Sequence, residues 1–575
     1  MKVESNLAFM TSGILIALVA TLSAQPQNLS KRLGYLATNL LVDENVSRDI
    51  AMLERAHKAG YNGVAVNDSK FLRWDSLPDH YKQNCLKLRN RAKSLGMEFI
   101  AGVCPIGYSN DLLSRDVNLA EGLPVVDSPF KATQDGRLVP FEDSPKVING
   151  GFEESTGDNP KGWGFVDEPG KISFIDRADF AEGRASLRME NIGKFDPQNG
   201  HGRAMQKIKT VPFHYYHVSV QVKTKEFETV GGLQILALGR GGRSLQQANL
   251  AVKRTMPWKK IDVTFNSLDS EEVNLYLGVW GGKGGTIWWD DLRIEPGGLV
   301  NLVRRPGAPF KVRSADGSAV FVEGVDYERA SDPKMGNAQW PGDYDVWHEQ
   351  PVWKLPVGSK IHPGQTVLVS YCCTALIYDG QAMCCLGEPK VDEILAWQIS
   401  EIQKNLQPDG YFLQHDEIRM TGWDASCTRT GKTPGQVLAD NVKKCITMIR
   451  KRDPGKAIYV WSDMFDPYHN AQATGPYYLV KGDGPWKGSW EGLDDKVIVV
   501  NWNSATDTRK KSMRFFSDRG NAQILAGYYD GPVNSIKDWL ADSSGIKSIN
   551  GVMYTTWIGS YSDLEQFMNA FQAKK

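Results

Sequence analysis

The chain has 575 residues, which is too long for one hydrophobic core and predicts two or three domains. Hydrophobic residues make up 41% and charged residues 23%, as in ordinary soluble proteins. The 67 basic side chains equal the 67 acidic ones, so the net charge gives no attraction to nucleic acid or to an anionic membrane, and neither is expected as a partner.

The N-terminus has the order of a secretory signal peptide. Lys2 precedes an apolar stretch at 13–20, which is too short to span a bilayer, and the small residues Ser23 and Ala24 follow it. We therefore expect residues 1–24 to be a signal peptide and the protein to be secreted or periplasmic. An uncleaved membrane anchor is the alternative.

Two parts of the chain alternate short apolar runs with amphipathic helical stretches. The first part is expected to hold strands at 33–37, 63–66 and 97–103 and helices at 46–59 and 81–95. The second is expected to hold strands at 411–415, 457–461, 497–502, 522–528 and 551–557 and helices at 392–406, 434–450, 509–516, 535–541 and 561–571. Residues 466–495 lack helical periodicity and predict a long loop in place of one helix.

Counted together, these runs give three strands before an interruption and five after it. Eight strand-helix units predict an α/β fold, a (β/α)8 TIM barrel formed by residues 31–146 and 389–575 and interrupted after strand three. An open, doubly wound sheet is the alternative. The carboxyl ends of the strands are where such barrels carry their chemistry.

The interruption is rich in short strands. Residues 147–297 combine alternating strands with Gly-rich turns and predict a β-sandwich, and residues 298–388 predict a second, β-rich lobe. The sandwich opens with Asn149-Gly150-Gly151-Phe152-Glu153 and closes with Trp289-Asp290-Asp291-Leu292. At both ends it resembles carbohydrate-binding modules of families 4, 9 and 22, which are jelly rolls. The resemblance implies a structural calcium ion between Glu153 and Asp291, since calcium takes oxygen ligands. Either a glycan-binding module or a purely structural insert fits these ends.

Two cysteine doublets stand close together, Cys372-Cys373 and Cys384-Cys385. Neighbouring residues of a strand face opposite ways, so one member of each doublet would be able to pair across a hairpin in an oxidising compartment. Buried free thiols are the alternative. The spacing does not predict a zinc site, because no further Cys or His follows at the usual separation.

The most informative segment is the apolar run at 411–413 that ends in the adjacent acids Asp416 and Glu417. Side chains alternate along a strand, so two neighbouring acids serve one ligand only where the backbone is leaving the sheet. Other polar and aromatic residues at strand ends are expected to bind substrate: His415, Trp461, Asp463, Trp502, Tyr528, Tyr529, Asp530, Trp557 and Asp68.

In this arrangement the chain resembles glycoside hydrolases, in particular the hexosaminidases of families 20 and 123. The resemblance rests on the Asp416-Glu417 pair, the motif Trp461-Ser462-Asp463-Met464-Phe465 and Trp557. The Gly-Gly that precedes the acids in family 20 is absent, and Gln414-His415 stand there.

The resemblance implies hydrolysis of β-linked 2-acetamido sugars in an oligo- or polysaccharide, without a catalytic cofactor. Glu417 would be the general acid, with a pKa raised by an apolar, aromatic surround. Asp416 would stay ionised and orient the acetamido group, whose carbonyl oxygen attacks the anomeric carbon. Trp461, Trp502 and Trp557 would surround the sugar, and Tyr528 or Tyr529 would hydrogen-bond the acetamido oxygen.

Two other functions fit the same residues. A retaining β-glycosidase acting on plain hexose or pentose glycans would use Glu417 as acid and Asp530 as nucleophile, about 5 Å apart. A secreted carbohydrate-binding protein without catalysis would use the same strand ends as a lectin-like site, and its binding would survive the loss of Glu417.

Overall fold

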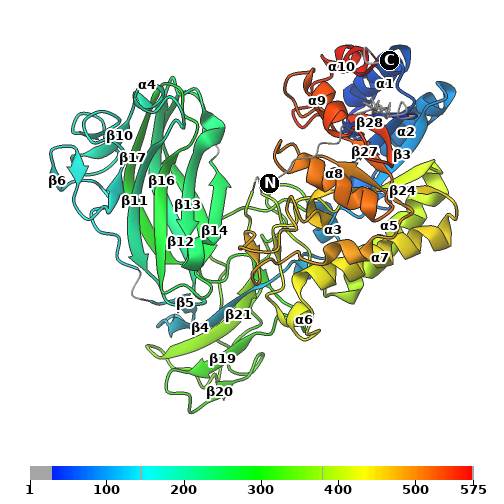
Figure 1. The fold of residues 1–575 in the computed structure, drawn as a ribbon. Coiled ribbons are helices and arrows are strands. Elements are labelled where there is room, and N and C mark those ends of the chain that lie inside the picture. Colours follow the sequence, from blue (N-terminus) through cyan, green and yellow to red (C-terminus); the bar gives the residue numbers. More distant parts are fainter. Residues whose placement is uncertain (1–28, 143–144, 251, 379, 573–575) are drawn as a thin grey trace, which may run out of the picture.

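The computed structural model describes residues 29–142, 145–250, 252–378 and 380–572, and the predicted signal peptide lies outside them. Eight parallel strands close into a barrel (Figure 1). In barrel order they are β1 (Lys31–Ala37), β2 (Gly63–Asn67), β3 (Glu98–Val103), β22 (Gly410–Leu413), β24 (Ala457–Trp461), β26 (Val497–Asn501), β27 (Gln523–Leu525) and β28 (Ile549–Tyr554). Within the described ranges, no helix has the length and apolar character needed to cross a membrane.

The predicted (β/α)8 TIM barrel is wrong. Seven helices accompany the barrel strands: α1 (Asp43–Ala59), α2 (Asp79–Ser94), α5 (Pro389–Leu406), α7 (Pro434–Arg452), α8 (Arg509–Asp518), α9 (Ser535–Asp542) and α10 (Leu564–Gln572). Between β24 and β26 the described chain has no α-helix but the 3-10 turns η5 (Asp463–Phe465) and η6 (Ser489–Gly492) and a two-residue strand at Leu479–Val480, so the predicted loop in place of a helix is confirmed. Glycines and prolines recur at 475–492 and disfavour a helix there. Strand and helix therefore do not alternate throughout, and much of the chain lies in antiparallel sheets.

The barrel is filled by side chains that alternate inward along its strands. Tyr35, Phe412 and Trp461 lie in this interior, and the Trp461 ring centroid is 4.6 Å from that of Phe412 and 5.2 Å from that of Tyr35. Gly63 faces Leu33 across the β1–β2 pair, where a Cβ atom would stand 2.6 Å from the Leu33 side chain. The sheet is closed because β28 pairs with β1, which excludes the open-sheet alternative.

Between β3 and β22 the chain forms two five-stranded antiparallel sheets that stand beside the barrel (Figure 1). One sheet contains β15 (Met256–Asn266), β12 (Tyr215–Lys225), β17 (Thr286–Pro296), β10 (Ser186–Met189) and β9 (Ser173–Asp176). The other contains β14 (Ser244–Asn249), β13 (Leu233–Leu238), β16 (Glu272–Val279), β11 (Gly202–Lys209) and β8 (Phe165–Val166). A two-stranded ribbon, β6 (Ser155–Thr156) with β7 (Asn159–Pro160), and the short helix α4 (Ile192–Phe195) complete this part.

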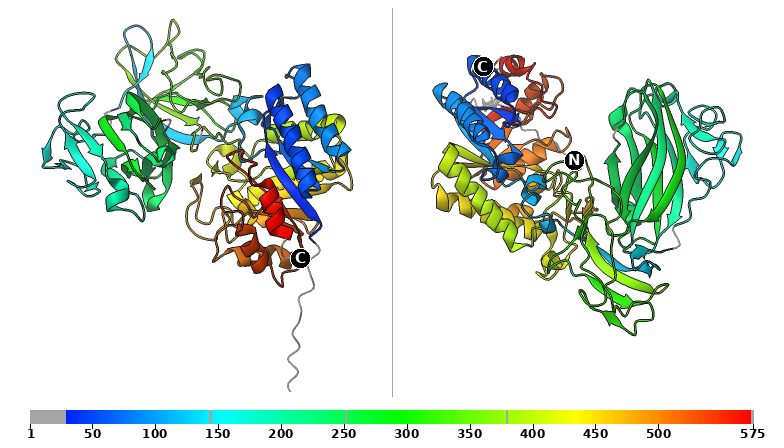
Figure 2. Two further views of the ribbon diagram at one scale, coloured as in Figure 1. Left: turned by 90° about the horizontal axis from the view of Figure 1, so that it is seen from above. Right: turned by 180° about the vertical axis from the view of Figure 1, so that it is seen from behind.

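A third antiparallel sheet lies at the end of the molecule where the paired sheets and the barrel are connected (Figure 2). It contains β20 (Val320–Phe321), β19 (Lys311–Ser314), β21 (Thr366–Cys373), β4 (Leu123–Ala132) and β5 (Leu138–Pro140), and β18 (Leu302–Val303) pairs with β21. The strands β4 and β5 come before the paired sheets in the chain, yet β4 pairs with β21, which comes after them. Two distant segments therefore build this sheet together.

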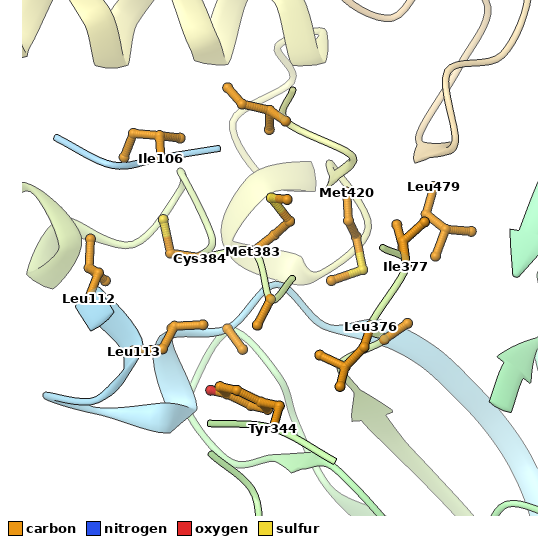
Figure 3. Packing of buried hydrophobic residues seen from close by; sticks show 14 of the residues in the cluster. Ile106, Leu112, Leu113, Tyr344, Leu376, Ile377, Met383, Cys384, Met420 and Leu479 are labelled. Atoms are coloured by element: carbon orange, nitrogen blue, oxygen red, sulfur yellow. The ribbon is translucent and has the colours of Figure 1, made fainter. Parts of the chain in front are cut away.

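An apolar layer joins the inserted region to the loops of the barrel (Figure 3). Leu376 and Ile377, from the chain after β21, lie near Met420 and Leu479, which start the two short barrel-loop strands β23 (Met420–Thr421) and β25 (Leu479–Val480). Met383 and Cys384 fill the middle of the layer. The loops above the barrel thus rest on a packed base, which restricts their motion.

Candidate active site

A pocket of about 500 Å³ opens at the carboxyl ends of the barrel strands. Its lining comes from several strand ends and from the inserted region, which contributes Tyr378. The lining residues are Tyr35, Ala37, Asn67, Ser69, Pro105, Tyr108, Tyr378, Gln414, Asp416, Glu417, Arg419, Trp502, Tyr529 and Trp557. Ligands of parallel sheets bind at this end, where loops from neighbouring strands converge.

Asp416 and Glu417 both line the pocket because the chain turns sharply after β22. Glu417 has a left-handed backbone with a φ of 50°, which is uncommon for a residue with a side chain. Its N–H donates to Asp463 Oδ2 at 2.9 Å. The backbone of Asp416 also packs against Gly107, where a Cβ atom would stand 1.6 Å from the Asp416 carbonyl oxygen. The turn that presents the two acids is therefore held on both sides.

The surround of Glu417 contains aromatic rings, as the sequence predicts, but it is polar and charged and not apolar. Arg419 Nη2 lies 2.8 Å from Glu417 Oε1, and the hydroxyl of Tyr108 donates to Glu417 Oε2 at 2.6 Å. Arg419 is buried and donates to Gln381, and its guanidinium lies 4.6 Å from the ring centroid of Tyr378. An ion pair of this kind orients a carboxylate and keeps it as an acceptor.

Asp416 has the opposite environment. It is buried, and burial together with the neighbouring charges of Asp463 and Glu417 raises its pKa well above the usual range. Burial also raises the pKa of Asp463 to about 6. The Asp463 carboxylate accepts hydrogen bonds from the N–H of Glu417, from Asn470 at 2.9 Å and from the indole N–H of Trp502 at 3.3 Å. The surroundings of Asp416 therefore favour its protonated form.

Aromatic rings form one wall of the pocket. Trp502 and Tyr529 stack with their planes 6° apart and their centroids separated by 5.9 Å. Trp557 lies 5.8 Å from Tyr529. Tyr529 is 50% exposed and Trp557 41% exposed, which leaves ring faces free for a ligand. Such faces stack on the apolar faces of sugar rings.

The structure brings five of the sequence-predicted residues to this pocket, namely Asp416, Glu417, Trp502, Tyr529 and Trp557. Two more lie beneath the pocket. Trp461 is buried in the barrel interior, and Asp463 accepts the N–H of Glu417 and so holds the turn that presents this residue. The lining residues Tyr108 and Tyr378 lie on loops without a sequence motif, so sequence reasoning missed them. For Arg419 the only signal is its position two residues after Glu417.

Four other sequence-predicted residues do not reach the pocket. Each has a structural partner elsewhere. The hydroxyl of Tyr528 donates to Asp563, and Asp530 accepts the N–H groups of Trp557 and Ile558. His415 contacts Asn441 at 3.0 Å. Asp68 accepts the N–H groups of Leu40 and Lys70. Tyr528 and Tyr529 face opposite ways, as neighbours in an extended segment do.

The predicted calcium ligands have a mixed fit. Glu153 Oε1 accepts the N–H of Arg184 at 2.7 Å, and its other oxygen is buried without a hydrogen-bond partner in the described part of the chain. Asp291 Oδ1 is paired with Arg293 at 2.7 Å. The buried Asp290, and not Asp291, lies close to Gly151 together with Glu153. The calcium ion between Glu153 and Asp291 stays a prediction.

No protein-family model matches the chain, and no curated protein matches it. Similar solved structures include a family 61 carbohydrate-binding module in complex with β-1,4-galactotriose, at 14% identity over 26% of this chain and 98% of that chain, with a TM-score of 0.21. The xylan-binding domain CBM22-1 from Paenibacillus barcinonensis shares 15% identity over 25% of this chain and 90% of that chain, with a TM-score of 0.19.

A rhamnosidase from Novosphingobium sp. PP1Y is similar over 94% of this chain, at 10% identity and a TM-score of 0.29. This chain spans 58% of the length of that enzyme. At these values the similarities assign the chain to no family, and the resemblance to hexosaminidases of families 20 and 123 is not confirmed by them.

Proposed function

We propose that the chain is a glycoside hydrolase that binds its saccharide in the pocket above the barrel. The observation that carries this proposal is the pairing of two adjacent carboxyls, Asp416 and Glu417, with an exposed aromatic wall in one pocket. Carboxyl pairs of unequal protonation perform glycosidic cleavage, and aromatic faces hold the sugar ring.

The environments of the two acids support roles opposite to those that the sequence predicts. Asp416, whose pKa is raised by burial and by nearby charge, is the better proton donor to the leaving oxygen. Glu417, which is held by Arg419, would be the second carboxylate of the pair. It would stabilise positive charge at the anomeric carbon or accept a substrate N–H.

The preferred substrate in this proposal is a β-linked 2-acetamido sugar. A nucleophile and an acid usually stand on opposite sides of the scissile bond, whereas Asp416 and Glu417 leave the same strand end. Among the described residues, no third carboxyl lines the pocket, and Asp530 is occupied with backbone N–H groups. The substrate's own acetamido oxygen would then supply the missing nucleophile, oriented by Glu417 through the acetamido N–H.

A substrate screen tests the activity. β-N-acetylglucosaminide and β-N-acetylgalactosaminide are compared with β-glucoside, β-galactoside and β-xyloside, each with and without a thiazoline that mimics the oxazolinium intermediate. We expect turnover of an acetamido substrate and inhibition by the thiazoline. Turnover of a plain glycoside without inhibition contradicts the acetamido proposal, and glycan binding without any turnover favours the lectin-like function.

Two amide variants test the roles. Asp416→Asn removes the proposed donor, so turnover of a substrate with a poor leaving group should fall by about 10²- to 10⁴-fold, while a dinitrophenyl glycoside is much less affected. Glu417→Gln should impair both substrates. The exposed Asp507, changed to Asn, is the matched acid-to-amide control. The reverse pattern returns the donor role to Glu417.

A further inference from the structure

Four side chains with metal-binding atoms converge beneath the pocket loops. Glu121, Cys385, Asp424 and Cys427 are all buried, at most 2% exposed, and one ligand atom from each lies within 4.8 Å of the others. They come from three separate segments. Glu121 follows the 3-10 turn η2 (Val117–Leu119), Cys385 precedes α5, and the last two bracket the start of the short helix α6 (Ala425–Thr428).

Three of the six separations among these atoms are those of a tetrahedral shell, and the other three are at most 4.8 Å. Cys385 Sγ and Cys427 Sγ are 3.5 Å apart, Cys385 Sγ lies 3.4 Å from Asp424 Oδ1, and Cys427 Sγ lies 3.6 Å from Glu121 Oε2. Zinc with Zn–S of about 2.3 Å and Zn–O of about 2.0–2.2 Å places its ligand atoms roughly 3.3–3.8 Å from one another. We propose that Glu121, Cys385, Asp424 and Cys427 form a structural zinc site.

Each carboxylate is oriented by its second oxygen. Glu121 Oε1 accepts the N–H of Trp423 at 2.8 Å, which turns Oε2 toward the cysteines. Asp424 Oδ2 accepts the N–H of Gly122 at 3.2 Å and pairs with Arg305. Asp424 Oδ1 also caps α6 by accepting the N–H of Ser426 at 2.9 Å, and a carboxylate oxygen keeps a further lone pair for a metal. Hydrogen-bonded ligands of this kind are typical of metal sites.

Charge supports a cation at this point. Arg305 pairs with Asp424 and with Glu388, but no cationic side chain of the described residues pairs with Glu121. A buried carboxylate without a counter-charge is costly. A zinc ion would supply the missing positive charge to Glu121 and to both thiolates. Soft sulfur ligands with carboxylates select zinc over calcium or magnesium.

The geometry indicates a structural role. All four ligands come from the protein and all are buried, so no position is left for a substrate, as in closed zinc sites. The segments that carry the ligands also reach the pocket. Gln381 lies four residues before Cys385, and Arg419 lies five residues before Asp424. The side chains of Gln381 and Arg419 hydrogen-bond each other beside Glu417. Zinc would fasten both segments where the inserted region meets the barrel.

Metal content tests the site. The full chain is purified without metal-affinity resin from zinc-supplemented medium, and zinc is measured by inductively coupled plasma mass spectrometry. We expect about one zinc ion per chain, held by two sulfur and two oxygen ligands in X-ray absorption spectra. The double variant Cys385→Ala/Cys427→Ala should lose zinc. The matched control Cys85→Ala/Cys373→Ala, which also removes two buried thiols, should keep it.

Two further measurements keep the test decisive if the double variant fails to fold. Glu121→Gln, which preserves shape, should retain zinc more weakly, and a chelator should lower the Tm of the wild-type protein until zinc is restored. Wild-type protein without zinc, in which all eight cysteines react as free thiols after denaturation, overturns the proposal. A Cys385–Cys427 disulfide found by mass spectrometry under non-reducing conditions overturns it as well.

Discussion

Arg419 and Glu417 form an ion pair of 2.8 Å at the rim of the pocket, with the guanidinium buried and the carboxylate partly exposed. The same guanidinium donates to Gln381 and lies over the rings of Tyr378 and Tyr478. The position of Glu417 thus depends on contacts from the inserted region as well as from the barrel. This dependence couples the two parts of the chain at the candidate active site.

Replacing Arg419 by Lys should lower kcat/KM by about tenfold or more, because an ammonium group cannot reproduce the planar, forked contacts of the guanidinium. The fold should be retained, since the charge stays. Arg419→Ala should also lower the free energy of unfolding by about 1–2 kcal/mol, a value reduced for the exposure of Glu417. Arg429→Lys, on the exposed surface, is the control. Unchanged kinetics in Arg419→Lys would show that Glu417 needs no fixed partner.

The buried acids predict a pH-dependent stability. Burial raises the pKa of Asp416, and that of Asp463 to about 6, above the roughly 3.9 of an unfolded Asp. Each acid therefore binds its proton more tightly in the folded state. The resulting stability is present below the unfolded pKa and is lost as pH rises through the folded pKa, between about 4 and 6 for Asp463.

Asp416→Asn removes this loss. At pH 8 we expect the Tm of Asp416→Asn to exceed that of the wild type by about 2–4 °C. This is the change in Tm that about 1 kcal/mol produces in domains of roughly 150–250 residues. At pH 4 the difference in Tm should be smaller. Tm is measured across this range for the wild type, Asp416→Asn and the control Asp507→Asn. A constant difference at all pH values would contradict a raised pKa at Asp416.

The sequence predicts the closed set of eight strands and the turn at Asp416 and Glu417 because these depend on local patterns. Apolar runs of strand length and the abrupt change to two acids are visible without tertiary structure. The (β/α)8 barrel was wrong because much of the chain lies in antiparallel sheets, whereas the predicted loop in place of a helix at 466–495 is confirmed.

Contacts between distant segments were not predictable. The ion pair of Glu417 with Arg419 depends on Gln381 and Tyr378, which the inserted region supplies, so the apolar surround expected for Glu417 was wrong. The same holds for the cluster at Glu121, which stands 306 residues before Cys427, while Cys385 stands 39 residues before Asp424. Only Asp424 and Cys427 stand at a short spacing, and two residues do not define a zinc motif.

The aromatic wall predicts a binding effect that is larger than any effect on chemistry. Tyr529→Ala or Trp557→Ala should weaken oligosaccharide binding by about 2- to 10-fold each, since ring stacking contributes roughly 0.5–1.5 kcal/mol. Isothermal titration calorimetry on the Asp416→Asn background measures this without turnover. Tyr528→Ala is the matched control, because its side chain faces Asp563. Equal losses in Tyr528→Ala would point to general loosening of the loop.

Asp530 distinguishes the acetamido-assisted mechanism from a retaining mechanism in which this residue is the nucleophile. Its carboxylate accepts the hydroxyl of Thr556 at 2.5 Å, the N–H of Trp557 at 2.6 Å and the N–H of Ile558 at 3.2 Å, so it holds the loop that carries Trp557. Asp530→Asn keeps the size of the side chain and weakens these bonds. We therefore expect KM to rise several-fold through displacement of Trp557, with kcat within about tenfold of the wild type. A nucleophile would behave differently: kcat would collapse, added azide would restore turnover, and a glycosyl-enzyme intermediate on Asp530 would be trapped by a fluorosugar. Kinetics of Asp530→Asn with and without azide, read beside intact-protein mass spectrometry, distinguish a residue that positions Trp557 from one that attacks the sugar.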